Sequence, residues 1–496
     1  MSQFSRFIFG ATIIVSLQAA PPVLIEQRFD QLRKSPPELY AFLLRMPKGG
    51  DLHNHLAGAV YAERFIDAAA ASGLCVDKQD WKMVATCSTP NDISAEMADH
   101  DNKTFNALID AFSMRDFVPG RQSAHDHFFD TFDLFTLADK GHTGEFIAEL
   151  ARRAADQNES YIELMALSGA GATSKLGAAT GLDKDLAITA EKLRAAGLPD
   201  LVSAVRSQMD QAEKQERAAL HCDSEPNSAP CKVVFRYVYQ ILREFPIEQV
   251  FAQTLAGFEL ASSDPRVVAI NYVQAEDGIN SMRNYHLHMQ MVDFAKRLYP
   301  KVHITLHAGE LVSGLVPPDG LRFHIREALD IGHAERIGHG VDVMYETGAV
   351  ELLKQMHAKN TAVEIALTSN DLILGVKGSD HPFPIYRKYG VPVVIVTDDE
   401  GVNRSHLTQE YLRAVLTYGL TYADLKQIVR NSLEYSFLSG PSYWADARYQ
   451  TPVRACAAGG AKTKLCEAFL AASDKATAQA DLEKRFREFE AATIKK

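Results

Sequence analysis

The segment that decides the fold is KVHITLHAGE at residues 301–310, which is followed by RIGHG at residues 336–340. The first motif is typical of a short β-strand that ends at His307, because it is β-branched and apolar up to a glycine break. The second motif places His339 at the end of another such strand, after a segment of helical length. Together they predict a βαβ unit, which brings both imidazoles to the carboxyl edge of a parallel sheet.

Short apolar runs of the same kind recur along the chain. There are eight of them, at residues 51–56, 161–165, 233–239, 267–273, 303–307, 336–339, 362–367 and 393–397. Helix-length segments separate these runs, and such alternation predicts an α/β fold with a parallel sheet. Eight units predict a closed (β/α)8 TIM barrel, whose functional groups gather at the carboxyl ends of the strands.

The rest of the chain divides around this barrel. The barrel is predicted to span residues 47–440, with a loop-rich insertion at about residues 72–125. Residues 21–46 predict extra N-terminal helices, broken in the middle by two prolines. Residues 441–496 predict a C-terminal cysteine loop followed by a charged helix.

The first twenty residues are typical of an export signal. Arg6 supplies a positive end, residues 7–17 form an apolar core too short to span a bilayer, and two alanines precede Pro21. The alternatives are a buried N-terminal segment or an anchor that is not cleaved. The signal predicts a periplasmic or secreted protein without stable membrane insertion after cleavage.

The six cysteines fit an oxidising compartment. Six cysteines allow fifteen connectivities, so the sequence alone does not prove any pairing. Pairing of sequence neighbours is the simplest scheme outside the cytosol. It predicts the disulfides Cys75–Cys87, Cys222–Cys231 and Cys456–Cys466. The alternative is that the cysteines are free buried thiols.

The charge balance is mildly acidic. With 52 basic and 63 acidic residues, the formal net charge is −11. Nucleic-acid binding needs a basic face, so we expect no nucleic-acid partner. The simplest interpretation of the acidic excess is solubility.

Ionisable side chains cluster at the predicted strand ends. His53 and His55 alternate along one strand and therefore point to the same side. The cluster contains His53, His55, His307, Glu310, His339, Asp398 and Asp399. Each histidine alone is better explained as a satisfied core residue, but the set suits zinc or another borderline divalent ion at a catalytic site. Glu310 follows a candidate ligand by three residues, which suits a general acid. The residues alone leave open whether His339 binds the metal.

These motifs together resemble the adenosine deaminase family of metal-dependent amidohydrolase barrels. The resemblance runs from about Met46 to about Leu416 and rests on motifs in the family's order. They are HxH at 53–55, HAGE at 307–310, RIGHG at 336–340, SN at 369–370 and TDDEGV at 397–402. The segment MPKGGDLHNHL and the export signal resemble the secreted, growth-factor-related branch, and TDDEGVNRSHLTQEY resembles bacterial members.

The resemblance implies a role for each residue of the cluster. One zinc ion per chain would be held by His53, His55, His307 and Asp398. Glu310 would protonate the purine N1, and Asp398 would also belong to the catalytic set. His339 would orient the attacking hydroxide and help to deprotonate it. Asp399 would hydrogen-bond the purine N7, with His55 also beside the substrate. The implied reaction converts adenosine, or a related 6-aminopurine nucleoside or base, to the 6-oxo product and ammonia.

The chain departs from the family pattern in two segments, at Ala57 and at residues 271–274. Ala57 stands where an acidic residue usually meets the ribose 5′-hydroxyl. Gln274 aligns with a glycine whose backbone meets the purine N3, and Asn271 stands where aspartate is common. These positions touch substrate recognition and not the metal centre, so Gln274 is retained as a substrate-binding candidate.

Other functions remain open at this stage. The departures are compatible with a secreted nucleoside-binding or signalling protein that keeps the barrel with little or no catalysis. A sibling amidohydrolase acting on another ring or amide is a third interpretation. Dinuclear amidohydrolases often use a lysine on the fourth strand, and residues 267–273 contain none, which favours one metal. The HxE…PCxxC signature of the nucleic-acid deaminases is absent. A homodimer is left open.

Overall fold

Eight parallel strands form a barrel in the computed structural model, which describes residues 22–120, 122–168, 171–457 and 463–494. The strands are β1 (Gly49–His55), β5 (Glu159–Ser168), β6 (Val234–Leu242), β7 (Val267–Val273), β8 (His303–Ala308), β9 (Arg336–His339), β10 (Ala362–Ile365) and β11 (Val393–Ile395). They pair in this order, each parallel to the next. The predicted (β/α)8 fold is confirmed, and each predicted strand overlaps an observed one.

The ring closes between the first and last strands. An isolated parallel bridge joins Asn54 to Asp398, just beyond the end of β11. The Asp398 N–H donates to the His53 carbonyl at 2.9 Å, and the His55 N–H donates to the Asp398 carbonyl at 3.3 Å. His53, His55 and Asp398 therefore take part in closing the barrel and also supply candidate metal-ligand side chains.

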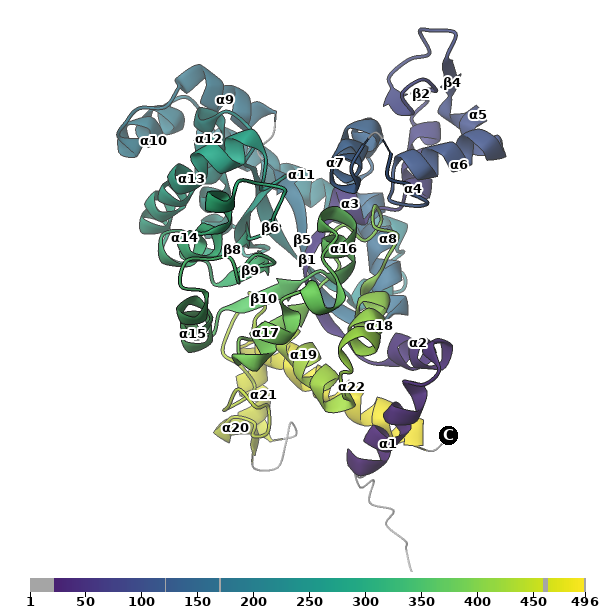
Figure 1. The fold of residues 1–496 in the computed structure, drawn as a ribbon, viewed down its shortest axis with the longest axis vertical. Coiled ribbons are helices and arrows are strands. Elements are labelled where there is room, and N and C mark those ends of the chain that lie inside the picture. Colours follow the sequence, from purple (N-terminus) through teal and green to yellow (C-terminus); the bar gives the residue numbers. More distant parts are fainter. Residues whose placement is uncertain (1–21, 121, 169–170, 458–462, 495–496) are drawn as a thin grey trace, which may run out of the picture.

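Helices surround the barrel, as Figure 1 shows. Those up to the middle of the chain are α1 (Pro22–Leu32), α2 (Pro36–Arg45), α3 (Leu56–Ala59), α4 (Ala62–Ala71), α5 (Ala95–His100), α6 (Asn102–Ala111), α7 (Ala124–Phe135), α8 (Thr143–Asp156), α9 (Ala172–Thr180), α10 (Leu186–Ala195), α11 (Leu198–Ala219) and α12 (Ile247–Ser263). The later ones are α13 (Ile279–Leu298), α14 (His324–Asp330), α15 (Ala349–Lys359), α16 (Leu367–Leu374), α17 (Phe383–Lys388), α18 (Leu407–Tyr418), α19 (Tyr422–Glu434), α20 (Arg454–Ala457), α21 (Lys464–Ala471) and α22 (Asp474–Ile494). The N-terminal helices α1 and α2 are separate, as the two prolines predict.

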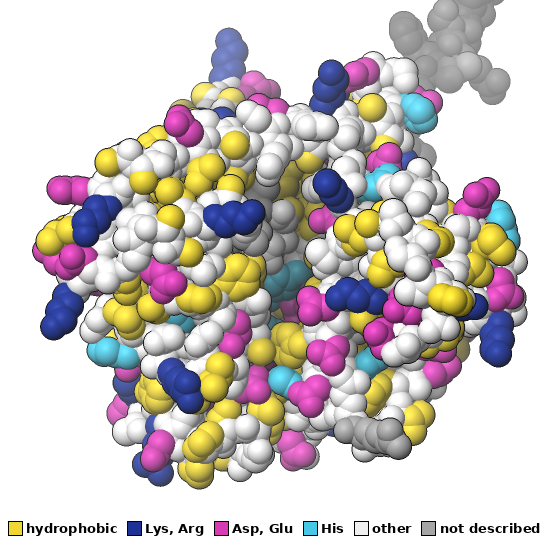
Figure 2. Space-filling model, turned by 90° about the horizontal axis from the view of Figure 1, so that it is seen from above, with side chains coloured by type: hydrophobic (Ala, Val, Ile, Leu, Met, Phe, Trp, Pro, Cys, Tyr) yellow, Lys and Arg dark blue, Asp and Glu magenta, His cyan; other side chains and the backbone are white. Residues whose placement is uncertain are grey.

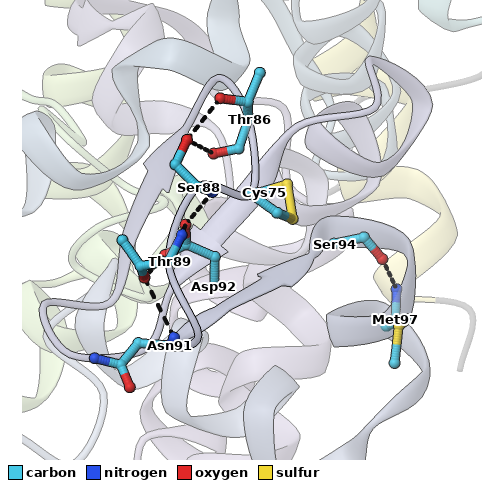
Figure 3. The surroundings of a disulfide bond; sticks show 9 residues. Cys75, Thr86, Ser88, Thr89, Asn91, Asp92, Ser94 and Met97 are labelled. Atoms are coloured by element: carbon cyan, nitrogen blue, oxygen red, sulfur yellow. Dashed lines mark hydrogen bonds between the residues drawn. A yellow bond between two sulfur atoms is a disulfide. The ribbon is translucent and has the colours of Figure 1, made fainter.

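The insertion contains more regular structure than its loop-rich prediction. Strands β2 (Cys75–Asp77), β3 (Lys82–Val84) and β4 (Asp92–Ser94) form an antiparallel sheet with β2 in the centre. Helices α5 and α6 follow, and Figure 1 shows this unit projecting from one edge of the barrel. The Asp92 carboxylate accepts the N–H groups of Ser88 and Thr89, which fixes the turn next to the disulfide in Figure 3. The strands are only three residues long, which explains why the sequence pattern did not reveal them.

The disulfides join sequence neighbours. The bonded pairs are Cys75–Cys87, Cys222–Cys231 and Cys456–Cys466. None of the six cysteines is left as a free thiol, so the alternative of buried thiols is wrong. Among the described residues, no helix is both long and apolar enough to cross a membrane. The predicted export signal lies outside the described residues.

A buried charge cluster fills the barrel interior. The Arg336 guanidinium donates to Glu163 and to Glu364, each at 2.5 Å, and all three side chains are at most 1% exposed. The guanidinium also lies 4.0 Å from the centre of the Phe437 ring. The carboxylates of Glu163 and Glu364 depend on the positive charge of Arg336, because an unpaired buried charge is costly.

We expect Arg336→Met to lower the free energy of unfolding by about 3–5 kcal/mol, because it leaves two buried carboxylates without their positive partner. Denaturant unfolding of the purified variant measures the change. The control is Arg64→Met, which removes an exposed ion pair with Asp67 and is expected to cost at most about 1 kcal/mol. Equal losses in the two variants would contradict the assigned role of Arg336.

Candidate active site

Four candidate ligands converge at the carboxyl end of the barrel. His53 and His55 come from β1, His307 from β8, and Asp398 from the segment after β11. The Nε2 atom of His307 lies 3.1 Å from Nε2 of His53 and 3.3 Å from Nε2 of His55. The Oδ1 atom of Asp398 lies 3.4 and 3.5 Å from the same two Nε2 atoms.

These separations fit one metal ion. Four atoms arranged tetrahedrally at about 2.0–2.1 Å from an ion are about 3.3–3.4 Å apart. Three imidazoles with one carboxylate are also a donor set that zinc accepts. The four residues therefore fit the ion that the sequence predicts, in number, chemistry and spacing.

Each ligand imidazole is held by an oxygen acceptor behind it. Nδ1 of His53 lies 2.7 Å from Glu364 Oε2, and Nδ1 of His55 lies 3.0 Å from Gln240 Oε1. Nδ1 of His307 lies 2.9 Å from Oδ1 of Asn271, which also accepts the His307 backbone N–H. An acceptor at Nδ1 keeps the proton there and leaves the Nε2 lone pair free for a metal. Asn271 supplies that acceptor as aspartate would, so the expectation that this departure touches substrate recognition and not the metal centre is wrong for Asn271.

The carboxylates around the cluster favour a positive charge at its centre. Burial by itself lowers the pKa of His53, but the carboxylates of Asp398 and Glu364 outweigh burial and raise this pKa to about 10. Burial lowers the pKa of His55 to about 4 and holds that of His307 well below its usual value. A bound divalent cation would supply that positive charge in place of the proton on His53.

Glu310 lies beside the ligand cluster, in the turn after β8. It is 8% exposed, and burial, helped by Asp398 and Glu276, raises its pKa well above the usual range. Glu276 holds this turn, because its carboxylate accepts the N–H of Gly309 at 2.9 Å and that of Glu310 at 2.8 Å. A raised pKa favours the protonated form of a carboxyl group, which is the form that can donate a proton.

Asp399 and His339 complete the surroundings of the cluster. Asp399 is 5% exposed, and burial together with Asp398 raises its pKa well above normal. It packs so closely on Gly58 that a Cβ there would lie 1.6 Å from Asp399 Oδ1, so only glycine fits. His339 is 1% exposed and lies with Glu310 and Asp398 in a second group whose ligand-type atoms are within 4.8 Å of one another.

Gln274 and Ala57, which both depart from the family pattern, have different surroundings. Gln274 has a φ of +80°, the left-handed conformation that glycine adopts readily. Its side-chain Oε1 accepts the N–H of Glu244 at 3.0 Å, so the side chain is occupied by its own backbone surroundings. Ala57 is exposed on α3 and offers no polar group at its position.

The end of the barrel that carries these groups is hollowed. In Figure 1, α3 and α16, which follow β1 and β10 closely, lie at the upper end of the barrel. Figure 2 looks onto that end and shows a hollow near its centre, with histidine visible at depth. Among the candidate ligands, His55 has the most accessible side chain, at 12%.

Sequence reasoning missed the residues that hold the ligands. Glu364, Gln240 and Glu276 were not singled out as site residues, and Asn271 was noted only as a departure. Glu364 is the single polar residue of an apolar strand, which is a sequence signal that could have found it, whereas the strand of Gln240 also contains Arg236 and gives no such signal. The side chains of His53, His55, His307 and Asp398 lie together, and so do those of Glu310, His339 and Asp398.

We expect Glu364→Gln to weaken metal binding by about 10–100-fold, because the variant loses the carboxylate that orients His53. Competition with a chromophoric chelator measures the affinity. Glu351→Gln, an exposed glutamate on α15, is the matched control and should leave it unchanged. An unchanged affinity in Glu364→Gln would mean that the packing of β1 alone orients His53.

The fold and this site define a barrel of the metal-dependent amidohydrolase class. The sequence model of the adenosine deaminase family matches residues 126–443, well over half of the chain. The chain belongs to the adenosine deaminase family.

Individual relatives and structures agree with this assignment. An adenosine deaminase from Vibrio vulnificus is 25% identical over 396 residues, which cover 78% of this chain and 94% of the relative. One from Clostridium perfringens is 34% identical over 137 residues, which cover 27% of this chain and 38% of the relative's length. An amidohydrolase from Burkholderia ambifaria with bound zinc has a TM-score of 0.56 at 18% identity and covers 92% of this chain and 94% of its own. An Arabidopsis N6-mAMP deaminase has a TM-score of 0.53 at 21% identity, over 80% of this chain and 96% of its own. The last two show the shared fold.

Proposed function

We propose that this protein is a zinc-dependent hydrolytic deaminase that converts adenosine, or a related 6-aminopurine nucleoside or base, to the 6-oxo product and ammonia. The observation that carries the proposal is the convergence of the three Nε2 atoms and Asp398 Oδ1 at metal-ligand spacing beside Glu310. Family membership supports it, as do relatives named adenosine deaminase. A structural neighbour is named as an adenine deaminase, which supports 6-aminopurines as the substrate class.

The ligand set supplies the chemistry that the reaction needs. His53, His55, His307 and Asp398 would hold one zinc ion, which when bound lowers the pKa of water toward neutrality and so supplies hydroxide. The oxygen acceptors behind the imidazoles keep their Nε2 lone pairs available for that ion.

Glu310 and Asp399 would act on the purine ring. The raised pKa of Glu310 keeps its proton available for N1, which makes C6 more electrophilic. Burial and Asp398 raise the pKa of Asp399, which favours the protonated carboxyl, and a protonated carboxyl can donate to the N7 acceptor. His55, which is the most exposed ligand with a side chain 12% accessible, would border the substrate.

Gln274 is compatible with purine binding through its backbone. Its left-handed φ and the hydrogen bond of its side chain to Glu244 favour a backbone contact with the substrate, as glycine would make. Ala57 removes the usual acidic contact to the 5′-hydroxyl, so we expect little discrimination at that hydroxyl.

A substrate panel tests the proposal. Purified, zinc-loaded protein is given adenosine, 2′-deoxyadenosine, adenine, AMP and N6-methyl-AMP, with absorbance and released ammonia both recorded. Turnover of at least one of them, in proportion to bound zinc, is expected. Binding of a nucleoside without ammonia release would favour the alternative, a secreted nucleoside-binding or signalling protein. The intact ligand set and Glu310 argue against that alternative.

We also propose that the protein works in the periplasm or outside the cell. The three disulfides support an oxidising compartment. Fractionation of the expressing cell, with detection of the chain in the periplasm or medium, tests this location. Recovery in the cytosol with reduced cysteines would contradict it.

A further inference from the structure

His339 is held in a different way from the three ligand histidines. Each of those has an oxygen acceptor at Nδ1, whereas Nδ1 of His339 lies 2.9 Å from the amide nitrogen Nδ2 of Asn370. Glu310 Oε1 is 3.5 Å from the same Nδ1, which is beyond the usual hydrogen-bond range. The proton position on His339 therefore depends on which way the Asn370 amide faces.

The orientation of that amide is set by a backbone group. The Phe383 N–H donates to Nδ1 of His381 at 3.1 Å, and a backbone N–H can only donate. Nδ1 of His381 therefore carries a lone pair, and the ring proton is on Nε2. That Nε2 lies 3.0 Å from Oδ1 of Asn370, so the amide oxygen accepts from it.

The NH2 end of the Asn370 amide determines the proton position on His339. With its oxygen facing His381, Asn370 presents its NH2 group to His339, and an amide NH2 can only donate. Nδ1 of His339 must accept, so the ring carries its proton on Nε2. If both ring nitrogens of His339 were protonated, its Nδ1–H group and the Asn370 NH2 group would be two donors facing each other. Nε2 of His339 has no hydrogen-bond partner among the described residues and lies 4.0 Å from Oδ2 of Asp398.

We infer that the chain Phe383 N–H, His381 and Asn370 fixes His339 as the Nε2–H tautomer, which makes His339 a hydrogen-bond donor toward the reacting oxygen and neither a metal ligand nor a base. Asn370 and His381 are then positioning residues that act through His339. This role in the reaction rests on the proposed deaminase function. The tautomer itself does not. The assignment also separates the ligand histidines, with free Nε2 lone pairs, from the fourth histidine beside them.

In this tautomer His339 differs from its expected role in one respect. The resemblance to the family implies that His339 helps to deprotonate the attacking water, which requires a lone pair on the nitrogen that faces it. In the Nε2–H tautomer that nitrogen donates instead. Orientation of the water by a donated hydrogen bond is the part of the role that remains.

Nitrogen-15 NMR of the zinc-loaded, histidine-labelled protein reads the tautomer directly, because protonated and unprotonated ring nitrogens have well-separated shifts. His339→Gln and His381→Gln spectra assign the two rings. We expect a protonated Nε2 in both His339 and His381. A wild-type His339 protonated on Nδ1 would overturn the inference, whatever the activity.

Asn370→Asp reverses the direction of the hydrogen bond between residue 370 and His339, with almost no change in the shape of the side chain. A carboxylate accepts from both neighbours, so His339 should move its proton to Nδ1. We expect kcat to fall by about 10²–10³-fold, the usual effect of losing one positioned donor, with a much smaller change in KM. His381→Gln keeps an N–H donor toward Asn370 and should retain most of kcat, whereas His381→Leu should not.

Asn360→Asp, an exposed residue after α15, controls for the added charge and should change neither reading. Asn370→Asp with wild-type kcat and an unmoved proton would overturn the inference. Failure of the proposed function gives a different result, in which wild type shows the expected tautomer but releases no ammonia from any 6-aminopurine.

Discussion

A Glu310→Gln protein is expected to lose deaminase activity by about 10²–10⁴-fold while keeping its fold and its metal. Glutamine can still hydrogen-bond, but it cannot give up a proton to the purine ring. The Glu310 side chain is not among the four convergent ligands, so metal content should stay at one ion per chain. Steady-state kinetics and metal analysis of the same preparation measure the two quantities.

The pH profile provides a second measurement of the same residue. Burial first, then Asp398 and Glu276, raise the pKa of Glu310. The acid is active while protonated, so activity should be present below the raised pKa and should fall as pH rises through it. Glu310→Gln should lose that alkaline limb from its residual activity. Glu351→Gln should keep both the wild-type rate and the wild-type pH profile. A Glu310→Gln enzyme with near-normal rates would contradict the assignment of Glu310 as the general acid.

A His55→Ala protein is expected to lose both the metal and the activity. His55 supplies one of the four convergent ligand atoms, and three remaining ligands hold a divalent ion much more weakly. The His55 side chain makes one hydrogen bond outside the cluster, to Gln240, so the fold should survive. Without the ion, water keeps its bulk pKa, and the supply of hydroxide at neutral pH collapses.

Metal content after gel filtration, circular dichroism and ammonia release are the measurements for His55→Ala. His286→Ala, which removes an exposed histidine whose side chain is 62% accessible, is the control and should match wild type. A His55→Ala protein with a full complement of zinc and normal turnover would show that the ligand set is wrong.

The fold could be predicted because its signal is local. Each apolar strand and each motif after it is readable in a few residues, as for residues 303–307 before HAGE. The pairing of His53 and His55 on one face followed from strand alternation. The short strands of the insertion gave no such periodicity, and this is why their sheet was not predicted.

The support of the site could not be predicted, because its partners are remote in sequence. His53 and Glu364 are 311 residues apart, and His55 and Gln240 are 185 apart. Whether a histidine faces an oxygen or an amide nitrogen depends on such contacts, and no spacing rule encodes them. This is also why the residues alone could not tell the role of His339 from that of a ligand.

The barrel must close before its metal site is complete. His53 stands near the start of the chain and Asp398 near its last strand, yet their backbones pair where the ring closes. An ion that needs both side chains cannot be bound before the first and last strands have paired. Metal binding therefore follows closure of the barrel, and the bound ion in turn would link the first strand to the last.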